Sequence, residues 1–134
     1  MNAAACAFRL PTTTSGGILI VDDEPIARTI LGLYFHQQGN PFWLAPDRAT
    51  ALRILESHGD AIGLVLLHSN ASTQDTADTL AQFREFKPEI AYYLMTAECG
   101  FDAEPQDAGA DGLIVKPLLF QALNLIVEKC FAHA

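Results

Sequence analysis

Five short apolar runs alternate with longer amphipathic segments along the chain. Each run is rich in branched or aromatic residues, and four of the five are followed directly by a polar or charged one. This pattern is typical of strands that are buried on both faces of a parallel sheet. The runs cover residues 18–21, 42–44, 64–67, 90–95 and 113–115.

The segments between the runs carry apolar residues at helical spacing. Pro25 at a first helical position predicts a helix that ends before Gly39, and Asp47 opens a second helix that ends near Gly59. We predict a polar loop over residues 69–76 and a third helix from Ala77. Pro105 limits a fourth helix to one or two turns within residues 100–108, and an apolar stripe predicts a last helix over residues 119–130.

Strict alternation of strands and helices predicts an α/β fold with a parallel sheet and right-handed crossovers. Polar residues follow four of the five strands, namely Asp22 with Asp23, His68, Thr96 and Lys116. Because the carboxyl ends of parallel strands meet at one edge of the sheet, these side chains should form one site.

Length and composition narrow the class of protein. The 134 residues fit one domain, which we expect at residues 17–134 after a flexible leader at 1–16. The formal charge of −8 repels phosphate backbones, so we expect no nucleic acid as partner. The sequence contains three cysteines without metal-like spacing and no membrane-length apolar run, which predicts a cytoplasmic protein that crosses no membrane.

The ordered motifs resemble the receiver domain of two-component response regulators. They are Val21-Asp22-Asp23-Glu24-Pro25, the apolar strand at 64–67, Thr96-Ala97, and Gly109-Ala110-Asp111-Gly112 leading to Lys116-Pro117. The resemblance implies a flavodoxin-like (βα)5 three-layer sandwich, with a parallel five-stranded sheet in the order 2-1-3-4-5.

The resemblance also assigns roles to individual residues. Asp22 and Asp23, with the main chain at Asn70, take the place of the Mg²⁺ ligands, while Thr96 and Lys116 take the place of the groups that contact the phosphoryl group. His68 stands where the family has its phosphorylated aspartate, and Leu113 stands where an aromatic switch residue is common. We expect Mg²⁺ to bind only weakly, because one carboxylate is missing, and we expect no other cofactor.

His68 leaves several interpretations open. The simplest is a structural one, in which His68 hydrogen-bonds to Asp22 or Asp23 and, together with Lys116, partly replaces the charge of the metal. A phosphohistidine at position 68 and a transition-metal site formed with the two aspartates are chemically conceivable alternatives.

We therefore predict a receiver-like signalling domain that is not an enzyme, is not phosphorylated at the usual position and acts through protein–protein contacts. The partner is a sensor kinase or a downstream signalling protein, or a second copy of the chain, at the face of the fourth and fifth strand–helix units. The alternative is a working phosphotransfer protein with a non-standard acceptor or residual Mg²⁺-dependent chemistry. A nucleotide or flavin binder is disfavoured, because acids replace the glycine-rich phosphate loop after the first strand.

Overall fold

Five parallel strands form a single sheet in the computed structural model, which describes residues 16–68, 73–96, 109–115 and 126–129. The order is β2-β1-β3-β4-β5, and every neighbouring pair is parallel. The predicted sheet and its strand order are confirmed. Each strand begins and ends within two residues of the apolar run that predicted it. The strands are β1 (Gly17–Val21), β2 (Phe42–Ala45), β3 (Ile62–His68), β4 (Ala91–Thr96) and β5 (Gly112–Val115).

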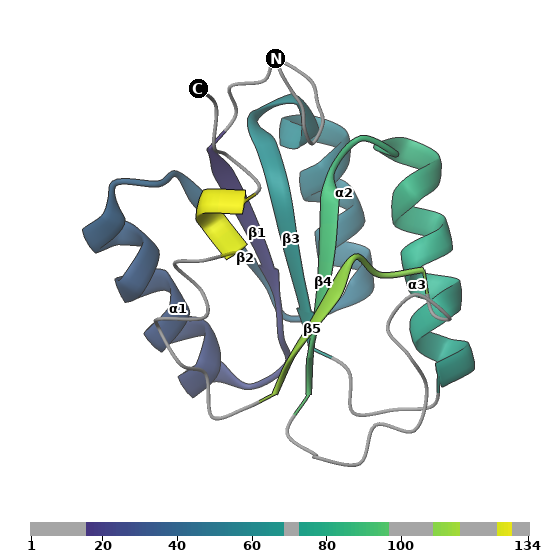
Figure 1. Ribbon diagram of the computed structural model, residues 1–134, viewed down its shortest axis with the longest axis horizontal. Helices are drawn as coiled ribbons and strands as arrows, with labels where there is room; N and C mark the ends of the chain where they lie inside the picture. The colour runs from purple at the N-terminus through teal and green to yellow at the C-terminus, as the bar shows by residue number, and fades with distance from the viewer. Residues whose placement is uncertain (1–15, 69–72, 97–108, 116–125, 130–134) are drawn as a thin grey trace.

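Helices cover both faces of the sheet and complete a three-layer sandwich (Figure 1). One face carries α1 (Pro25–Gln38) and the helical residues 126–129, and the other carries α2 (Arg48–His58) and α3 (Thr73–Phe86). A short 3-10 turn, η1 (Gly59–Ala61), links α2 to β3. The predicted leader, apart from residue 16, and the predicted helix at 100–108 lie outside the described residues. So does most of the predicted helix at 119–130.

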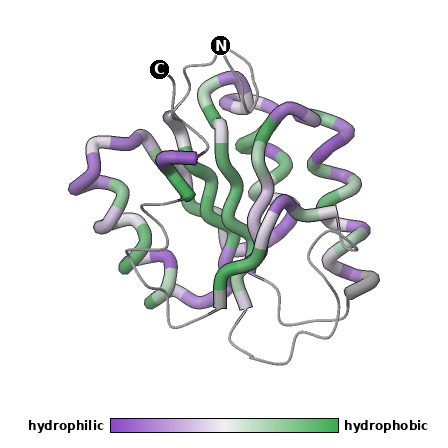
Figure 2. Tube along the Cα trace, in the orientation of Figure 1, coloured by the Kyte–Doolittle hydropathy of each residue, from purple (hydrophilic) through white to green (hydrophobic). Residues whose placement is uncertain are grey.

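Alternation along the strands divides the core between these two faces. In β1, Leu19 and Val21 pack toward α2 and α3, while Ile18 and Ile20 pack toward α1. Leu64 to Leu67 divide in the same way, and they are all buried. The hydropathy colouring shows that the central strands β1 and β3 are mostly apolar, whereas the helices around the sheet have mixed character (Figure 2). The apolar strands are therefore buried between the two helical layers, and the polar residues at their carboxyl ends remain to form the site.

The helix ends follow local signals, with one correction. Gly39 ends α1 in a left-handed conformation with φ of 80°, and the Asp47 side chain caps α2 by accepting a hydrogen bond of 2.8 Å from the Thr50 N–H. The predicted start of α3 is wrong, because the helix begins at Thr73 rather than after residue 76. Polar residues are common in the first turn of a helix as well as in loops, so the polar residues at 73–76 do not distinguish the two.

His58, the last residue of α2, packs against an aromatic side chain. Its imidazole stacks on the Trp43 indole with ring centroids 5.3 Å apart and an interplanar angle of 24°. Trp43 itself packs against the core on the α2–α3 face. The exposed histidine therefore covers part of an aromatic core residue at the end of α2.

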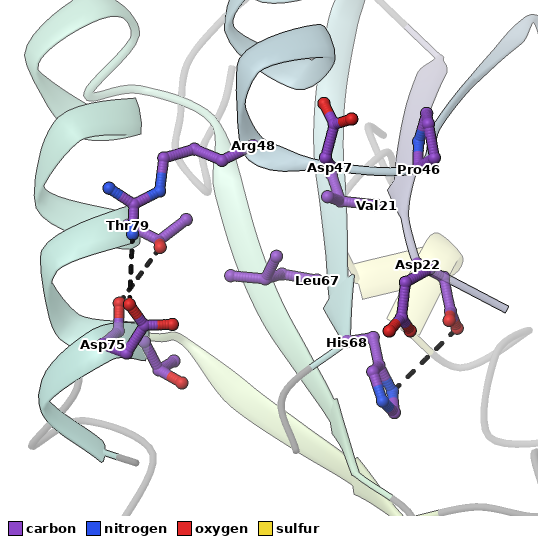
Figure 3. Close-up of a pocket in the computed structure, with 11 residues that line it drawn as sticks. Val21, Asp22, Pro46, Asp47, Arg48, Leu67, His68, Asp75 and Thr79 are labelled. Atoms are coloured by element: carbon purple, nitrogen blue, oxygen red, sulfur yellow. Dashed lines mark hydrogen bonds and ion pairs between the residues drawn. The ribbon is translucent and has the colours of Figure 1, made fainter. Parts of the chain in front are cut away.

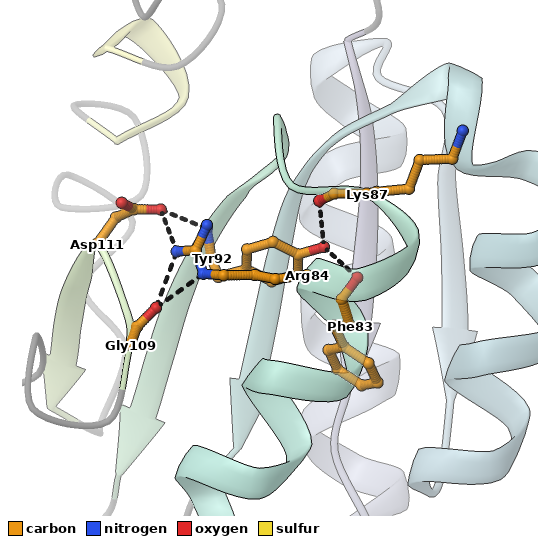
Figure 4. Close-up of polar contacts among 6 residues, drawn as sticks. All are labelled: Phe83, Arg84, Lys87, Tyr92, Gly109 and Asp111. Carbon is orange, nitrogen blue, oxygen red and sulfur yellow. Dashed lines mark hydrogen bonds and ion pairs between the residues drawn. The ribbon is translucent and has the colours of Figure 1, made fainter.

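A group of polar contacts joins α3, β4 and the turn before β5 (Figure 4). We call it the Tyr92 cluster, and its members are Phe83, Arg84, Lys87, Tyr92, Gly109 and Asp111. Within the cluster, the buried Tyr92 hydroxyl lies 2.8 Å from the Lys87 carbonyl oxygen and 3.3 Å from the Phe83 carbonyl oxygen, so it donates at the end of α3. Burial raises the pKa of the Tyr92 phenol above its usual value of 10.0. The hydroxyl therefore remains a neutral donor at physiological pH.

The remaining contacts of the Tyr92 cluster centre on the Asp111 carboxylate. It accepts hydrogen bonds from the Tyr92 backbone N–H at 2.8 Å and from Arg84 at 3.3 Å. The Arg84 guanidinium also donates to the Gly109 carbonyl oxygen at 2.8 Å and lies over the Tyr92 ring, 4.7 Å from its centroid. Each of these polar groups has a partner, so the cluster fixes α3 to the sheet.

The described part of the chain contains no helix that is both long enough and apolar enough to cross a bilayer.

Candidate functional site

The ends of β1, β3 and β4 come together at the carboxyl edge of the sheet. Val21 pairs with Leu67, and His68 pairs with Met95, which precedes Thr96. Asp22 directly follows β1, and His68 and Thr96 are the last residues of β3 and β4. The predicted convergence of polar residues is present at these three strand ends.

Asp22 is an almost completely buried acid at this edge, with 1% of its surface exposed. Its Oδ1 accepts a hydrogen bond of 2.9 Å from the Glu24 N–H in the turn that leads into α1. Its backbone carbonyl accepts a hydrogen bond of 2.6 Å from Arg28 in the first turns of α1. Sequence analysis missed Arg28, whose only signal was a cation six residues after Asp22.

The imidazole of His68 faces the Asp22 carboxylate from the end of β3 (Figure 3). The side chain of His68 is 8% exposed, and its Nδ1 lies 4.0 Å from Asp22 Oδ2. Among the described residues, Nδ1 is a buried polar atom with no hydrogen-bond partner. His68 thus lies beside the Asp22 carboxylate, as the structural interpretation predicts, but the separation of 4.0 Å is too long for the predicted hydrogen bond from Nδ1.

Asp22, Asp23 and His68 form a compact set of metal-ligand types. One oxygen from each aspartate and one imidazole nitrogen all lie within 4.8 Å of one another. The two carboxylates suit Mg²⁺, which prefers oxygen ligands, whereas the third group offers a nitrogen. The set therefore fits a magnesium ion only in part.

A pocket of about 180 Å³ extends from this set toward the space between α2 and α3. At its far side Arg48, at the start of α2, forms an ion pair of 3.4 Å with Asp75, in the first turn of α3 (Figure 3). Neither role was predicted, because an ion pair between two helices leaves no short sequence motif. Asp75 thus lies at the opposite wall of the pocket, in contact with a cation.

The other predicted site residues are placed as follows. Thr96 is buried, with 2% of its surface exposed, and Leu113 packs against the core on the α2–α3 face. Asn70 and Lys116 lie outside the described residues. The described part of the site thus consists of the acidic end of β1, His68 and Thr96.

Comparison with known proteins identifies the family. The sequence profile of the response regulator receiver domain matches residues 18–128, which is most of the chain. The chain belongs to the response regulator receiver domain family. It is therefore a receiver domain of the two-component systems, as its motifs predicted.

Curated relatives are longer regulators. The chain is 31% identical over 118 residues to the transcriptional regulatory protein ZraR of Klebsiella oxytoca, covering 87% of this chain and 26% of ZraR. It is 32% identical over 120 residues to the regulatory protein AtoC of Escherichia coli, covering 87% of this chain and 25% of AtoC. The chain thus spans about a quarter of the length of these relatives.

Solved structures show the same fold. A receiver domain protein from Clostridium thermocellum superposes with a TM-score of 0.74 at 22% identity, covering 86% of this chain and 93% of that one. The response regulator TrrA of Thermotoga maritima, solved in complex with Mg²⁺ and beryllofluoride, has a TM-score of 0.70 at 26% identity. This match covers 85% of this chain and 97% of TrrA.

Proposed function

We propose that this receiver domain does not form the usual aspartyl phosphate and that it transmits its signal through contacts with other proteins. The observation that supports this proposal is the buried imidazole of His68 at the end of β3, beside Asp22. In the family resemblance this position belongs to the phosphorylated aspartate. An imidazole cannot form an acyl phosphate, so the usual acceptor chemistry has no group to act on.

The nearby acids do not replace the missing acceptor. Asp75 lies in the first turn of α3, its side chain is 62% exposed, and it pairs with Arg48 across the pocket. Asp22 and Asp23 follow β1 and occupy the positions of metal ligands. The residual site keeps two of the carboxylates that hold Mg²⁺ in the family, which supports weak Mg²⁺ binding without transfer of a phosphoryl group.

An exposed apolar stripe on α1 supports a role in protein contacts. Ile26, Ile30 and Leu33 are 75%, 46% and 59% exposed and follow one another at helical spacings of four and three residues. The face predicted from sequence, on the fourth and fifth strand–helix units, lies largely outside the described residues. The proposed partner is a sensor kinase, a downstream signalling protein or a second copy of this chain.

The chain turns over no metabolite and acts in the cytoplasm, and its charge of −8 disfavours direct contact with nucleic acid. Curated relatives include a DNA-binding regulator, NtrC of Bradyrhizobium, of which this chain spans 25%.

Incubation with Mg²⁺ and a small phosphodonor such as acetyl phosphate tests the proposal, with intact mass as the readout. The wild type should gain no phosphoryl group, whereas His68→Asp should gain one that is labile at alkaline pH, as an acyl phosphate is. His68→Asn is the matched control, since it resembles aspartate in shape but has no carboxylate. A stable phosphoryl adduct on the wild type would establish a non-standard acceptor and refute the proposal.

The homodimer can be separated from other partners by sedimentation. If α1 forms a homodimer interface, the wild type should sediment as a dimer and Ile30→Asp as a monomer, because a charge would be buried in the interface. If the wild type and Ile30→Asp both sediment as monomers, the partner is a different protein.

A further inference from the structure

His68 changes which metal ions the acidic site prefers. We propose that Asp22, Asp23 and His68 form a binding site for a divalent transition metal of the zinc, cobalt or nickel class, in preference to Mg²⁺. This inference deepens the proposed function, because it concerns the same site and what that site binds in place of a phosphoryl group. Its test is independent of phosphorylation.

The unpartnered nitrogen of His68 is the observation that goes beyond an acidic cluster. The side chain is more than nine-tenths buried, yet no donor or acceptor among the described residues reaches Nδ1. A buried polar atom without a partner costs roughly 1–3 kcal/mol, so such atoms are rare unless they serve a bound group. Nδ1 points toward the Asp22 carboxylate, where a cation would lie between the two (Figure 3).

The chemistry of the three groups determines the class of metal. Imidazole nitrogen is a good ligand for zinc, copper, nickel and iron, whereas Mg²⁺ strongly prefers six oxygen ligands. Two carboxylates and one imidazole leave further positions open for water or another ligand, as in three-residue zinc sites. Replacing a carboxylate by an imidazole thus weakens the site for Mg²⁺ and strengthens it for the later transition metals.

The geometry requires only a small adjustment. The ligand atoms lie within 4.8 Å of one another, and Nδ1 and Asp22 Oδ2 are 4.0 Å apart. Tetrahedral zinc, with bonds of about 2.0–2.1 Å, places neighbouring ligand atoms roughly 3.3 Å apart. Binding therefore draws His68 Nδ1 and Asp22 Oδ2 together by about 0.7 Å, and the most widely separated ligand atoms by up to about 1.5 Å, through rotation of the side chains.

A bound metal would join the end of β1 directly to the end of β3. In the described structure these two ends share backbone pairing up to Val21 and Leu67, while the side chains of Asp22 and His68 approach without a hydrogen bond. A metal that bridges them would fix the two strand ends relative to each other. The site would then respond to metal concentration.

The experiment is a titration of the ¹⁵N-labelled full chain with Zn²⁺, with and without Mg²⁺ in large excess. Zn²⁺ should shift the amide signals of residues 21–24 and 67–68 and the imidazole nitrogen signals of His68, and excess Mg²⁺ should not reverse these shifts. Co²⁺ in place of Zn²⁺ should give a visible absorption band from the same site.

Three variants make the test specific. His68→Gln should weaken Zn²⁺ binding at these amides by at least about tenfold, while His36→Gln, an exposed histidine of α1, should leave it unchanged. His68→Asp should reverse the preference, with tighter Mg²⁺ and weaker Zn²⁺ binding. Binding elsewhere on the chain, including at its cysteines, would survive His68→Gln and would leave the β1 and β3 amides unmoved.

The inference is overturned if Zn²⁺ at millimolar concentration leaves these signals in place, or if Zn²⁺ and Mg²⁺ compete on equal terms in the wild type. Either result would leave the proposed function intact, because the phosphodonor experiment would still show whether position 68 accepts a phosphoryl group. Conversely, a phosphorylated wild type that also binds Zn²⁺ would refute the proposed function and retain the metal site.

Discussion

Two polar clusters at opposite edges of the sheet differ in how completely their groups are paired. In the Tyr92 cluster, at the amino ends of β4 and β5, the hydroxyl, the guanidinium and the carboxylate all have partners. At the carboxyl ends of β1 and β3, Asp22 and His68 face each other, and Nδ1 of His68 has no partner among the described residues. The first arrangement stabilises the fold, and the second is typical of a binding site.

The difference follows from the physics of burial. A buried polar group that is paired contributes about 1 kcal/mol to stability, whereas one left without a partner costs a similar amount or more. Folding alone would therefore favour an apolar residue at position 68.

Removing the central acceptor of the Tyr92 cluster should have the largest effect on stability. Asp111→Ala leaves the Tyr92 backbone N–H without its acceptor and removes a partner of Arg84, so we expect a loss of about 1–3 kcal/mol in the free energy of unfolding. Chemical denaturation measures this loss. Asp111→Asn, which keeps an acceptor oxygen, should lose clearly less, and equal losses for the two variants would show that the hydrogen bonds are not the cause.

Tyr92→Phe should have a smaller effect. It removes a single hydroxyl that lies against the Lys87 and Phe83 carbonyl oxygens, and these oxygens retain other ways of being satisfied at a helix end. We expect a loss of about 1 kcal/mol in the same denaturation experiment. If the variant were as stable as the wild type, the hydroxyl would make no contribution to the stability of the cluster.

The opposite result is expected at the other edge of the sheet. In metal-free buffer, His68→Leu replaces an unpartnered polar group by an apolar one of similar size, so the free energy of unfolding should stay the same or rise by up to about 1 kcal/mol. A loss larger than that of Tyr92→Phe would show that His68 stabilises the fold, as the structural interpretation from sequence held.

The smallest expected effect concerns alkaline pH. Burial raises the pKa of Tyr92 in the folded state above the value of 10.0 that applies to the unfolded chain. The contribution of this phenol to stability is therefore complete below pH 10 and is lost as the pH rises above it. Tyr92→Phe should flatten the decline between pH 10 and 11 relative to the wild type, and parallel declines in thermal melts would contradict this assignment.

The sequence predicted the sheet well, because a strand buried on both faces leaves a continuous apolar run. Residues 64–67 are buried in the structure as the run at those positions indicated. Strand order came from the resemblance to the receiver family rather than from the runs themselves. The start of α3 was mistaken, since Thr73 and the polar residues after it suit a first helical turn as well as a loop.

The sequence predicted which residues form the site, but it did not predict the contacts that they make. Strand ends brought Asp22 and His68 to one edge, which follows from parallel topology. Their separation of 4.0 Å, and the bond from Arg28 to the Asp22 carbonyl, depend on backbone geometry and on side-chain conformations that no sequence motif encodes. The ion pair of Arg48 with Asp75 joins two helices and was invisible for the same reason.

The most direct test of the central claim is an amide NMR titration of the full chain with Mg²⁺ and then with beryllofluoride, which mimics a phosphoryl group on a receiver aspartate. If His68 has replaced the acceptor, beryllofluoride should add no shifts to those caused by Mg²⁺ in the wild type. The same titration of His68→Asp should move the signals of Thr96 and of residues 67–68. Beryllofluoride-dependent shifts at Thr96 in the wild type would show that a carboxylate still accepts the group and would contradict the account.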